Sequence, residues 1–149
     1  MASSDDPHNL QRFVDAQALE FEQVCVELRA GQKRSHWMWF IFPQLRGLGR
    51  SSTAQLFGIG SLAEARAYLA HPELAPRLIA CVQTVLGLNG GSLHAVFGSP
   101  DDVKFCSSMT LFGVVSGHPI FDQALLVYCN GARDQATLDI LQAMDHARR

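Results

Sequence analysis

The sequence has no excess of positive charge and no long apolar run, and both absences narrow its function. Its 12 lysine and arginine residues, against 14 aspartate and glutamate residues, give a formal net charge of −2. A basic stripe, the mark of a nucleic-acid-binding surface, is missing. No apolar stretch approaches the roughly 18–20 residues of a membrane span. Residues 1–6 carry no basic segment followed by an apolar run, so we expect no secretory signal. The sequence therefore predicts a cytoplasmic protein that binds neither nucleic acid nor a membrane.

Motifs for metal and cofactor binding are missing as well. The four cysteines, Cys25, Cys81, Cys106 and Cys129, form no Cys-x-x-Cys pair, and we expect all four to be reduced and partly buried. The six histidines show no metal-ligand spacing. The glycines match neither Gly-x-Gly-x-x-Gly nor Gly-Lys-Ser. We therefore predict no metal site and no bound cofactor.

The sequence does contain enough apolar material for a core, together with clear helix signals. At 149 residues and 48% hydrophobic content, it fits one helical domain over residues 1–149, with residues 1–5 as a disordered tail. Helix starts are indicated by capping residues and by proline, at Asp6-Pro7, Ser61, Ser92, Ser99-Pro100, His118-Pro119 and Asp134. Between Gly113 and Gly117 the pattern breaks, with a short extended piece expected at Val114-Val115. We predict an all-α fold, a compact single-domain multihelical bundle of about seven helical segments.

One stretch, residues 35–44 (SHWMWFIFPQ), holds both tryptophans and two of the nine phenylalanines. A run this apolar must lie in or against the core, and the polar residues at its ends then need hydrogen-bond partners or a ligand. Ser35 can cap a short helix here and Pro43 can end it, although an apolar run of this length could equally form a buried strand. Because the surrounding segments are helical, we predict a short buried aromatic helix.

The first group of candidate site residues lies in and beside this stretch and comprises Lys33, His36, Trp37, Trp39 and Gln44. His36 could act as a general acid or base near neutral pH, and the tryptophans offer flat faces for stacking. Lys33 and His36 are three residues apart, which on a helix places them on one side. In the alternative interpretation, His36 is anchored by a backbone carbonyl and both tryptophans belong to the core.

The second group lies in residues 104–110 (KFCSSMT) and comprises Lys104, Ser107, Ser108 and Thr110. A lysine with hydroxyls on one helical side could bind an anion or a ribose. Serines inside a helix need an explanation, because they are weak helix formers. The alternative explanation is close helix packing, with hydroxyls bonded to the previous turn and Lys104 paired with Asp101.

Three segments resemble a known family: residues 31–44 (GQKRSHWMWFIFPQ), 70–74 (AHPEL) and 104–112 (KFCSSMTLF). They look like the uncharacterised all-helical family catalogued as domain of unknown function 1810, and the resemblance covers nearly the whole chain. It implies a small, mostly helical fold, and it carries over neither an activity nor catalytic residues. Some members are labelled calpastatin. That label does not fit, because calpastatin-type inhibitors are disordered and polar, whereas this chain has capped helices and core material.

We hypothesise a site for a small molecule, either binding or catalytic, where residues 33–44 meet the helix over residues 104–110. Lys33 and Lys104 would hold an anionic group, and His36 would be the catalytic acid or base. The remaining ligand-binding residues would be Trp37, Trp39, Gln44, Ser107, Ser108 and Thr110. A nucleotide or nucleotide-derived metabolite fits these groups best. The alternative is a non-enzymatic protein–protein interaction module, with no particular partner indicated, in which the same residues hold the fold together.

Overall fold

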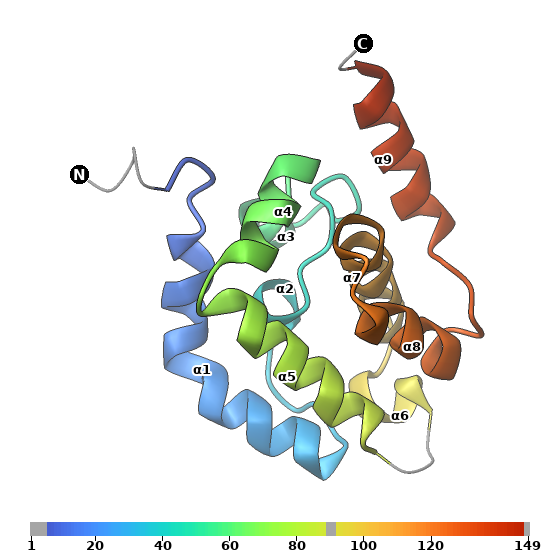
Figure 1. Ribbon diagram of the computed structural model, residues 1–149. Helices are drawn as coiled ribbons and strands as arrows, with labels where there is room; N and C mark the ends of the chain where they lie inside the picture. The colour runs from blue at the N-terminus through green and yellow to red at the C-terminus, as the bar shows by residue number, and fades with distance from the viewer. Residues whose placement is uncertain (1–5, 89–91, 148–149) are drawn as a thin grey trace.

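The structure, a computed structural model, describes residues 6–88 and 92–147, and that part of the chain is all-α (Figure 1). The helices are α1 (Gln11–Ala30), α2 (Met38–Ile41), α3 (Ser52–Phe57), α4 (Leu62–Ala70), α5 (Leu74–Leu86), α6 (Leu93–Phe97), α7 (Asp101–Ser116), α8 (Pro119–Tyr128) and α9 (Gln135–Ala147). The predicted fold class is confirmed, with nine helices in the described ranges where about seven were expected. The predicted tail over residues 1–5 lies outside those ranges. Among the described helices, none combines the length and apolar character needed to cross a bilayer.

Two helices, α5 and α7, lie at the centre of the packing. α7 packs against α4, α6, α8 and α9, and α5 packs against α1, α4 and α8. In Figure 1, α1 forms one side of the molecule, α6 and α8 lie toward the other side, and α9 projects away from the remaining helices. The short helix α2 contacts α1 and α3. The short helix α2 therefore lies between the two helices that precede and follow it in the chain.

The prediction of a short buried aromatic helix is confirmed by α2 and its neighbours. Trp37 and Phe42, which flank α2, are 0% and 1% exposed. The Phe42 ring lies 5.0 Å from the ring of Phe105 on α7 and 5.8 Å from the ring of Phe97 on α6. Edge-to-face pairs such as these add about 0.5–1.5 kcal/mol each beyond the area that they bury. They fix α2 against the helices that carry the second group of candidate residues.

Several helix starts follow the capping signals in the sequence. Ser61 Oγ accepts the backbone N–H of Glu64 at 3.0 Å, and Glu64 Oε1 accepts the N–H of Gly60 at 2.9 Å. His118 Nδ1 accepts the N–H of Ile120 at 3.1 Å, just before α8. The bonds from Glu64 and Ile120 satisfy backbone donors that the first turn of a helix leaves without a partner, and the bond from Gly60 ties the residue before the cap to α4. Capping chemistry therefore located these starts from the sequence alone.

Three predicted starts differ from the structure in detail. The carboxylate of Asp6 accepts the N–H groups of Leu10 and Gln11 at 2.7 and 2.9 Å, so α1 begins at Gln11 and not beside Pro7. Ser35 does not cap the aromatic helix, because its hydroxyl donates to a buried carboxylate of α1. At the start of α7 the cap position is Pro100 and no side chain caps the helix. The Asp6 cap thus acts over a longer span than expected, and a contact with α1 engages the Ser35 hydroxyl.

The expected extended piece at Val114-Val115 is wrong, because α7 continues through it to Ser116. Gly113 lies inside this helix and is buried. A Cβ added there would lie 3.4 Å from Phe121 Cβ and 3.3 Å from Asp122 Oδ1. The glycine therefore lets α8 approach α7 closely, and this packing outweighs its weak helix propensity.

The expectation of four reduced thiols is wrong for two of them. Cys106 of α7 and Cys129, which follows α8, form a disulfide. Cys25 and Cys81 are free thiols. Burial raises the pKa of the Cys81 thiol to about 12, with Cys25 adding to the effect, so this thiol stays protonated. The sequence did not indicate the disulfide, because the two cysteines meet only when α8 folds back along α7.

Candidate functional site

The two lysines of the chain, far apart in the sequence, meet at one carboxylate. Lys33 Nζ lies 2.9 Å from Asp101 Oδ2, and Lys104 Nζ lies 3.6 Å from Asp101 Oδ1. The side chains of Lys33 and Asp101 are only 8% and 19% exposed. Two ammonium groups against one carboxylate leave an excess of one positive charge in a partly buried place. The structure therefore brings together the two cations that the sequence placed in separate groups.

Backbone features on both sides hold this lysine pair in place. Gly31 ends α1 in the left-handed conformation at φ 73°, which turns the chain toward Lys33. The N–H of Lys33 then donates to the carbonyl of Val96 on α6 at 2.7 Å. On the other side, Asp101 is the first residue of α7 and Lys104 follows one turn later. The lysine pair therefore joins the end of α1 to the start of α7.

Each lysine also lies over an indole ring. Lys33 Nζ is 5.3 Å from the ring centre of Trp37, and Lys104 Nζ is 5.4 Å from that of Trp39. Both distances fall in the range of cation–π attraction. Trp39 is half-buried, and the exposed ring of His36 lies 6.5 Å from it at an angle of 32°. Trp39 thus links the lysine pair to the imidazole at the surface.

A carboxylate that the sequence analysis did not identify holds the aromatic segment. Glu27 of α1 is 2% exposed. Its Oε1 accepts the backbone N–H groups of Arg34 and Ser35 at 2.7 and 3.0 Å and the Nε1–H of Trp37 at 2.9 Å. Its Oε2 accepts the Ser35 hydroxyl at 2.6 Å and the Gln23 amide at 2.9 Å. Burial raises the pKa of Glu27, but these hydrogen bonds outweigh burial and lower the pKa to about 2.

The position of Glu27 in the sequence already indicates that it is buried. Glu27 lies between the buried residues Val24 and Leu28 on the apolar stripe of α1. A charged residue on such a stripe is seldom buried unless several donors surround it. With its indole N–H bonded to Glu27 and its ring 0% exposed, Trp37 belongs to the core. Its ring therefore offers no face to a ligand in this structure.

Two of the candidate hydroxyls on α7 face α9 and not the lysine pair. Asp134 Oδ2 accepts the Ser107 hydroxyl and the N–H of Thr137, each at 3.1 Å. The N–H of Asp134 donates to Thr110 Oγ1 at 2.8 Å. The single hydroxyl proton of Ser107 is shared between Asp134 and the carbonyl of Val103, one turn back in α7, and the Thr110 hydroxyl donates to the carbonyl of Cys106. These contacts position the first turn of α9, which is the packing role considered as the alternative for these hydroxyls.

Ser108 and Gln44 are the two remaining polar candidates. Ser108 follows Lys104 by one helical turn, is 0% exposed, and its Oγ finds no hydrogen-bond partner among the described residues. A buried hydroxyl without a partner is unusual in a folded protein. Gln44 borders a narrow cleft beside Trp39 and Phe57 with a volume of about 10 Å³. That volume accommodates about one water molecule and no larger ligand.

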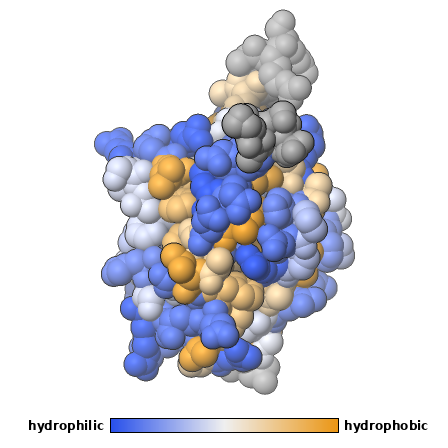
Figure 2. Space-filling view, turned by 90° about the vertical axis from the view of Figure 1, so that its left-hand side faces the viewer, coloured by the Kyte–Doolittle hydropathy of each residue, from blue (hydrophilic) through white to orange (hydrophobic). Residues whose placement is uncertain are grey.

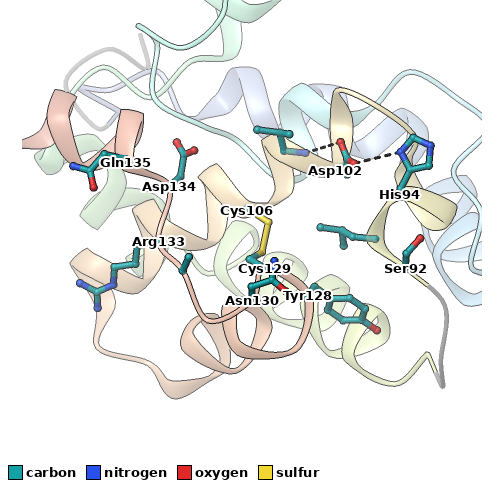
Figure 3. A pocket seen from close by; sticks show the side chains of 13 residues that line it. Ser92, His94, Asp102, Cys106, Tyr128, Cys129, Asn130, Arg133, Asp134 and Gln135 are labelled. Atoms are coloured by element: carbon teal, nitrogen blue, oxygen red, sulfur yellow. Dashed lines mark hydrogen bonds and ion pairs between the residues drawn. A yellow bond between two sulfur atoms is a disulfide. The ribbon is translucent and has the colours of Figure 1, made fainter.

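A wider hollow lies on a different face of α7 (Figure 3). Its volume is about 480 Å³, and α6, α7 and the segment between α8 and α9 enclose it. Among its lining residues are His94, Asp102, Cys106, Tyr128, Arg133 and Asp134. His94 Nδ1 lies 3.4 Å from Asp102 Oδ2 at the rim. The sequence analysis did not predict this hollow, because its residues come from three separate segments without a common motif.

Comparison with known proteins places the chain in a family but gives no activity. The profile of a family described as "Protein of unknown function (DUF1810)" matches residues 7–141. The crystal structure of the conserved hypothetical protein Rv1873 from Mycobacterium tuberculosis is 51% identical in sequence and similar in structure, with a TM-score of 0.91. The match covers 92% of this chain and 99% of that one. No curated protein matches the sequence significantly.

Proposed function

The chain belongs to the DUF1810 family, whose function is unknown, and we propose from its own site that it binds a small anionic ligand with a flat ring, of the nucleotide class. One observation carries the proposal: both lysines of the chain converge on Asp101 beside the half-buried side chain of Trp39. A cation pair next to an aromatic face is a combination that can recognise a phosphate attached to a ring.

The lysine pair keeps donors for an anion. Each ammonium group has three N–H donors, and the ion pairs with Asp101, at 2.9 and 3.6 Å, engage at most one donor of each lysine. A phosphate that bridges Lys33 and Lys104 would therefore bind without breaking the ion pairs. The net positive charge at this place favours an anion, and the low exposure of Lys33 limits the screening of that attraction by water.

The remaining roles follow from accessibility. Trp39 would stack on the ring of the ligand, and the Gln44 amide would donate or accept a hydrogen bond at the edge of that ring. His36 is exposed beside Trp39 and would act as acid or base if the ligand is processed. Ser108, one turn from Lys104, is 0% exposed, so its hydroxyl is not accessible to the ligand in this structure. We leave Trp37, Ser107 and Thr110 out of the proposed site, since the core and α9 engage them.

Ligand-induced stabilisation tests the proposal. We would measure the melting temperature of the full chain with nucleoside monophosphates and diphosphates, sugar phosphates, free nucleosides and inorganic phosphate. A ligand at 100 times its Kd stabilises the folded state by about 2.7 kcal/mol, which raises Tm measurably. We expect nucleotides to raise Tm more than phosphate or nucleosides alone. No increase with any of these compounds would refute the proposal.

Matched variants locate the binding. Lys104→Gln removes one of the two cations, and Trp39→Leu removes the stacking face. We expect Lys104→Gln to weaken the response to nucleotides and to phosphate, and Trp39→Leu to abolish the advantage of nucleotides over phosphate. Arg29→Gln removes an exposed cation at the end of α1 and should leave every response unchanged. A Lys104→Gln protein that responds like the wild type would place the ligand elsewhere.

The alternative function is a non-enzymatic protein interaction module in which the lysine pair only joins α1 to α7. The low exposure of Lys33 and its ion pair with Asp101 favour such a structural role. Exposed large apolar side chains include Leu19 on α1 and Leu126 on α8, at 90% and 71% exposure, which lie on different helices. On the face seen in Figure 2, hydrophilic side chains interrupt the apolar areas. In this case Lys104→Gln would lower stability and no small ligand would raise Tm.

A further inference from the structure

The disulfide between Cys106 and Cys129 lies at the hollow between α6, α7 and the segment that leads to α9 (Figure 3). We propose that this disulfide is a thiol-exchange site that small thiols and dithiols reach through the hollow, and that its reduction loosens the hold of α7 on residues 129–134. The inference is independent of the ligand proposed for the lysine pair, which lies on a different face of α7.

The position of the disulfide at the hollow distinguishes this pair from Cys25 and Cys81, which are not among the residues that line it. Both Cys106 and Cys129 are half-buried and line the hollow of about 480 Å³. Figure 3 shows the bond between the sulfur atoms with the side chains of Tyr128 and Asn130 beside it. Cys81, by contrast, is 2% exposed. Since exchange requires a thiolate to approach a sulfur atom directly, the hollow gives a small thiol a route to this disulfide.

The lining of the hollow suits small polar thiols. Arg133 supplies a positive charge, while Asp102 and Asp134 supply negative charges. His94, whose side chain is 68% exposed, lies at the rim near Asp102. With charges of both signs around the opening, neither an anionic nor a neutral thiol is excluded by long-range repulsion. The substrate class is therefore low-molecular-weight thiols and dithiols.

Residues 129–134 connect α8 to α9, and one strip of α7 holds them at both ends. Cys106 binds Cys129 covalently at the first end. At the second end, Ser107 and Thr110 form hydrogen bonds with Asp134, which starts α9. Once the disulfide is broken, the hydrogen bonds of Ser107 and Thr110 with Asp134 still hold the second end. With the covalent tie at the first end gone, the segment would open more often.

A dithiol can reduce the disulfide between Cys106 and Cys129 in two exchange steps. A thiolate of the dithiol attacks one sulfur of the disulfide, forming a mixed disulfide while the bond between Cys106 and Cys129 breaks. The released cysteine takes up a proton as a thiol. The second thiolate of the dithiol then attacks the mixed disulfide, releases the other cysteine, and closes a cyclic disulfide. Two electrons pass from the dithiol, which is oxidised, to the protein disulfide, which is reduced.

The test uses the air-oxidised full chain with dithiothreitol and without denaturant. Free thiols are then trapped with N-ethylmaleimide and located by peptide mass, and amide hydrogen exchange is followed in parallel. We expect loss of the disulfide-linked peptide, labelling of both Cys106 and Cys129, and faster exchange over residues 129–137 with little change in α5. Two outcomes would overturn the inference: a disulfide that resists reduction until the protein is unfolded, or reduction without faster exchange over residues 129–137.

Two variants separate the disulfide from the other cysteines. In Cys106→Ser/Cys129→Ser, we expect the fast exchange over residues 129–137 before any dithiol is added, and no further change after it. Cys25→Ser should keep the full response of the wild type. Wild-type exchange kinetics in the double variant would count against the inference. If the double variant does not fold, the reduction of the wild-type protein still decides, because it uses the same exchange measurement.

Discussion

Replacing Glu27 by glutamine keeps the shape of the side chain and removes the charge that holds the aromatic segment to α1. The carboxylate is 2% exposed and accepts five hydrogen bonds, from Gln23, Arg34, Ser35 (two) and Trp37. A glutamine amide would turn an N–H group toward some of these donors, and the bonds that remain would lose their charge. We therefore expect Glu27→Gln to be strongly destabilising.

The lowered pKa of Glu27 gives the size and the pH dependence of this effect. The hydrogen bonds lower the pKa from the usual 4.5 to about 2 despite burial. Because a tenfold change in an acid constant corresponds to ~1.36 kcal/mol, the ionised carboxylate contributes about 3 kcal/mol to the free energy of unfolding. A depressed pKa makes this contribution complete above about pH 4.5, and the contribution is lost as pH falls toward 2. The difference between wild type and variant should shrink over that window.

Urea unfolding followed by tryptophan fluorescence measures this difference, because Trp37 is fully buried next to Glu27. The control is Glu22→Gln, an exposed residue on the same helix, for which we expect a change within about 0.5 kcal/mol. A loss below about 0.5 kcal/mol for Glu27→Gln at pH 7 would show that the carboxylate does not hold the segment. A loss of the same size at pH 3 as at pH 7 would refute the electrostatic argument.

Two further predictions concern α9 and the loop before α4. Asp134→Ala removes the cap of α9, so we expect the free energy of unfolding to fall by about 1–2 kcal/mol and hydrogen exchange in the first turn to become faster. Asp139→Ala on the same helix is the control and should cost less. Equal losses for the two variants would contradict the capping role. At Gly58 an added Cβ would lie 2.5 Å from Arg46 Cα, so the backbone at Arg46 would have to shift. We therefore expect Gly58→Ala to lower the free energy of unfolding, measured in urea, by about 1–3 kcal/mol. Gly87→Ala is the control, since its added Cβ meets nothing closer than 3.4 Å, and it should cost less; the reverse order would contradict the packing argument.

The candidate site was predictable in part. Lys33 and Lys104 were assigned to one site from separate motifs, and the structure brings them together at Asp101. Ser107 was grouped with Lys104 because residues three apart share a side of a helix, yet they are separated by about 60° around the axis. Because of that angle, Ser107 contacts Asp134 at the start of α9, whereas Lys104 lies over Trp39 of the aromatic segment. Helical spacing alone could not show which neighbour covers which part of α7.

His36 and Glu27 show how a buried polar residue differs from an exposed one in its sequence signal. His36 was singled out because imidazole is a familiar catalytic group, and Glu27 was passed over as one of many acids on a helix. In the structure it is Glu27 that is buried and hydrogen-bonded, whereas His36 is exposed. Position on an apolar stripe is therefore a stronger signal than residue type for locating a buried polar centre.

By itself the sequence determined the helices and the burial of the aromatic segment, because caps, apolar periodicity and hydrophobicity act within a few residues. The capping box at Ser61 and the enclosure of Trp37 are results of this local kind. Only the tertiary structure decided which distant groups meet, as in the pairs of Lys33 with Asp101 and of Cys106 with Cys129. Such pairs depend on how whole helices pack against one another, and helix packing is set by the shape of all the side chains in the core together.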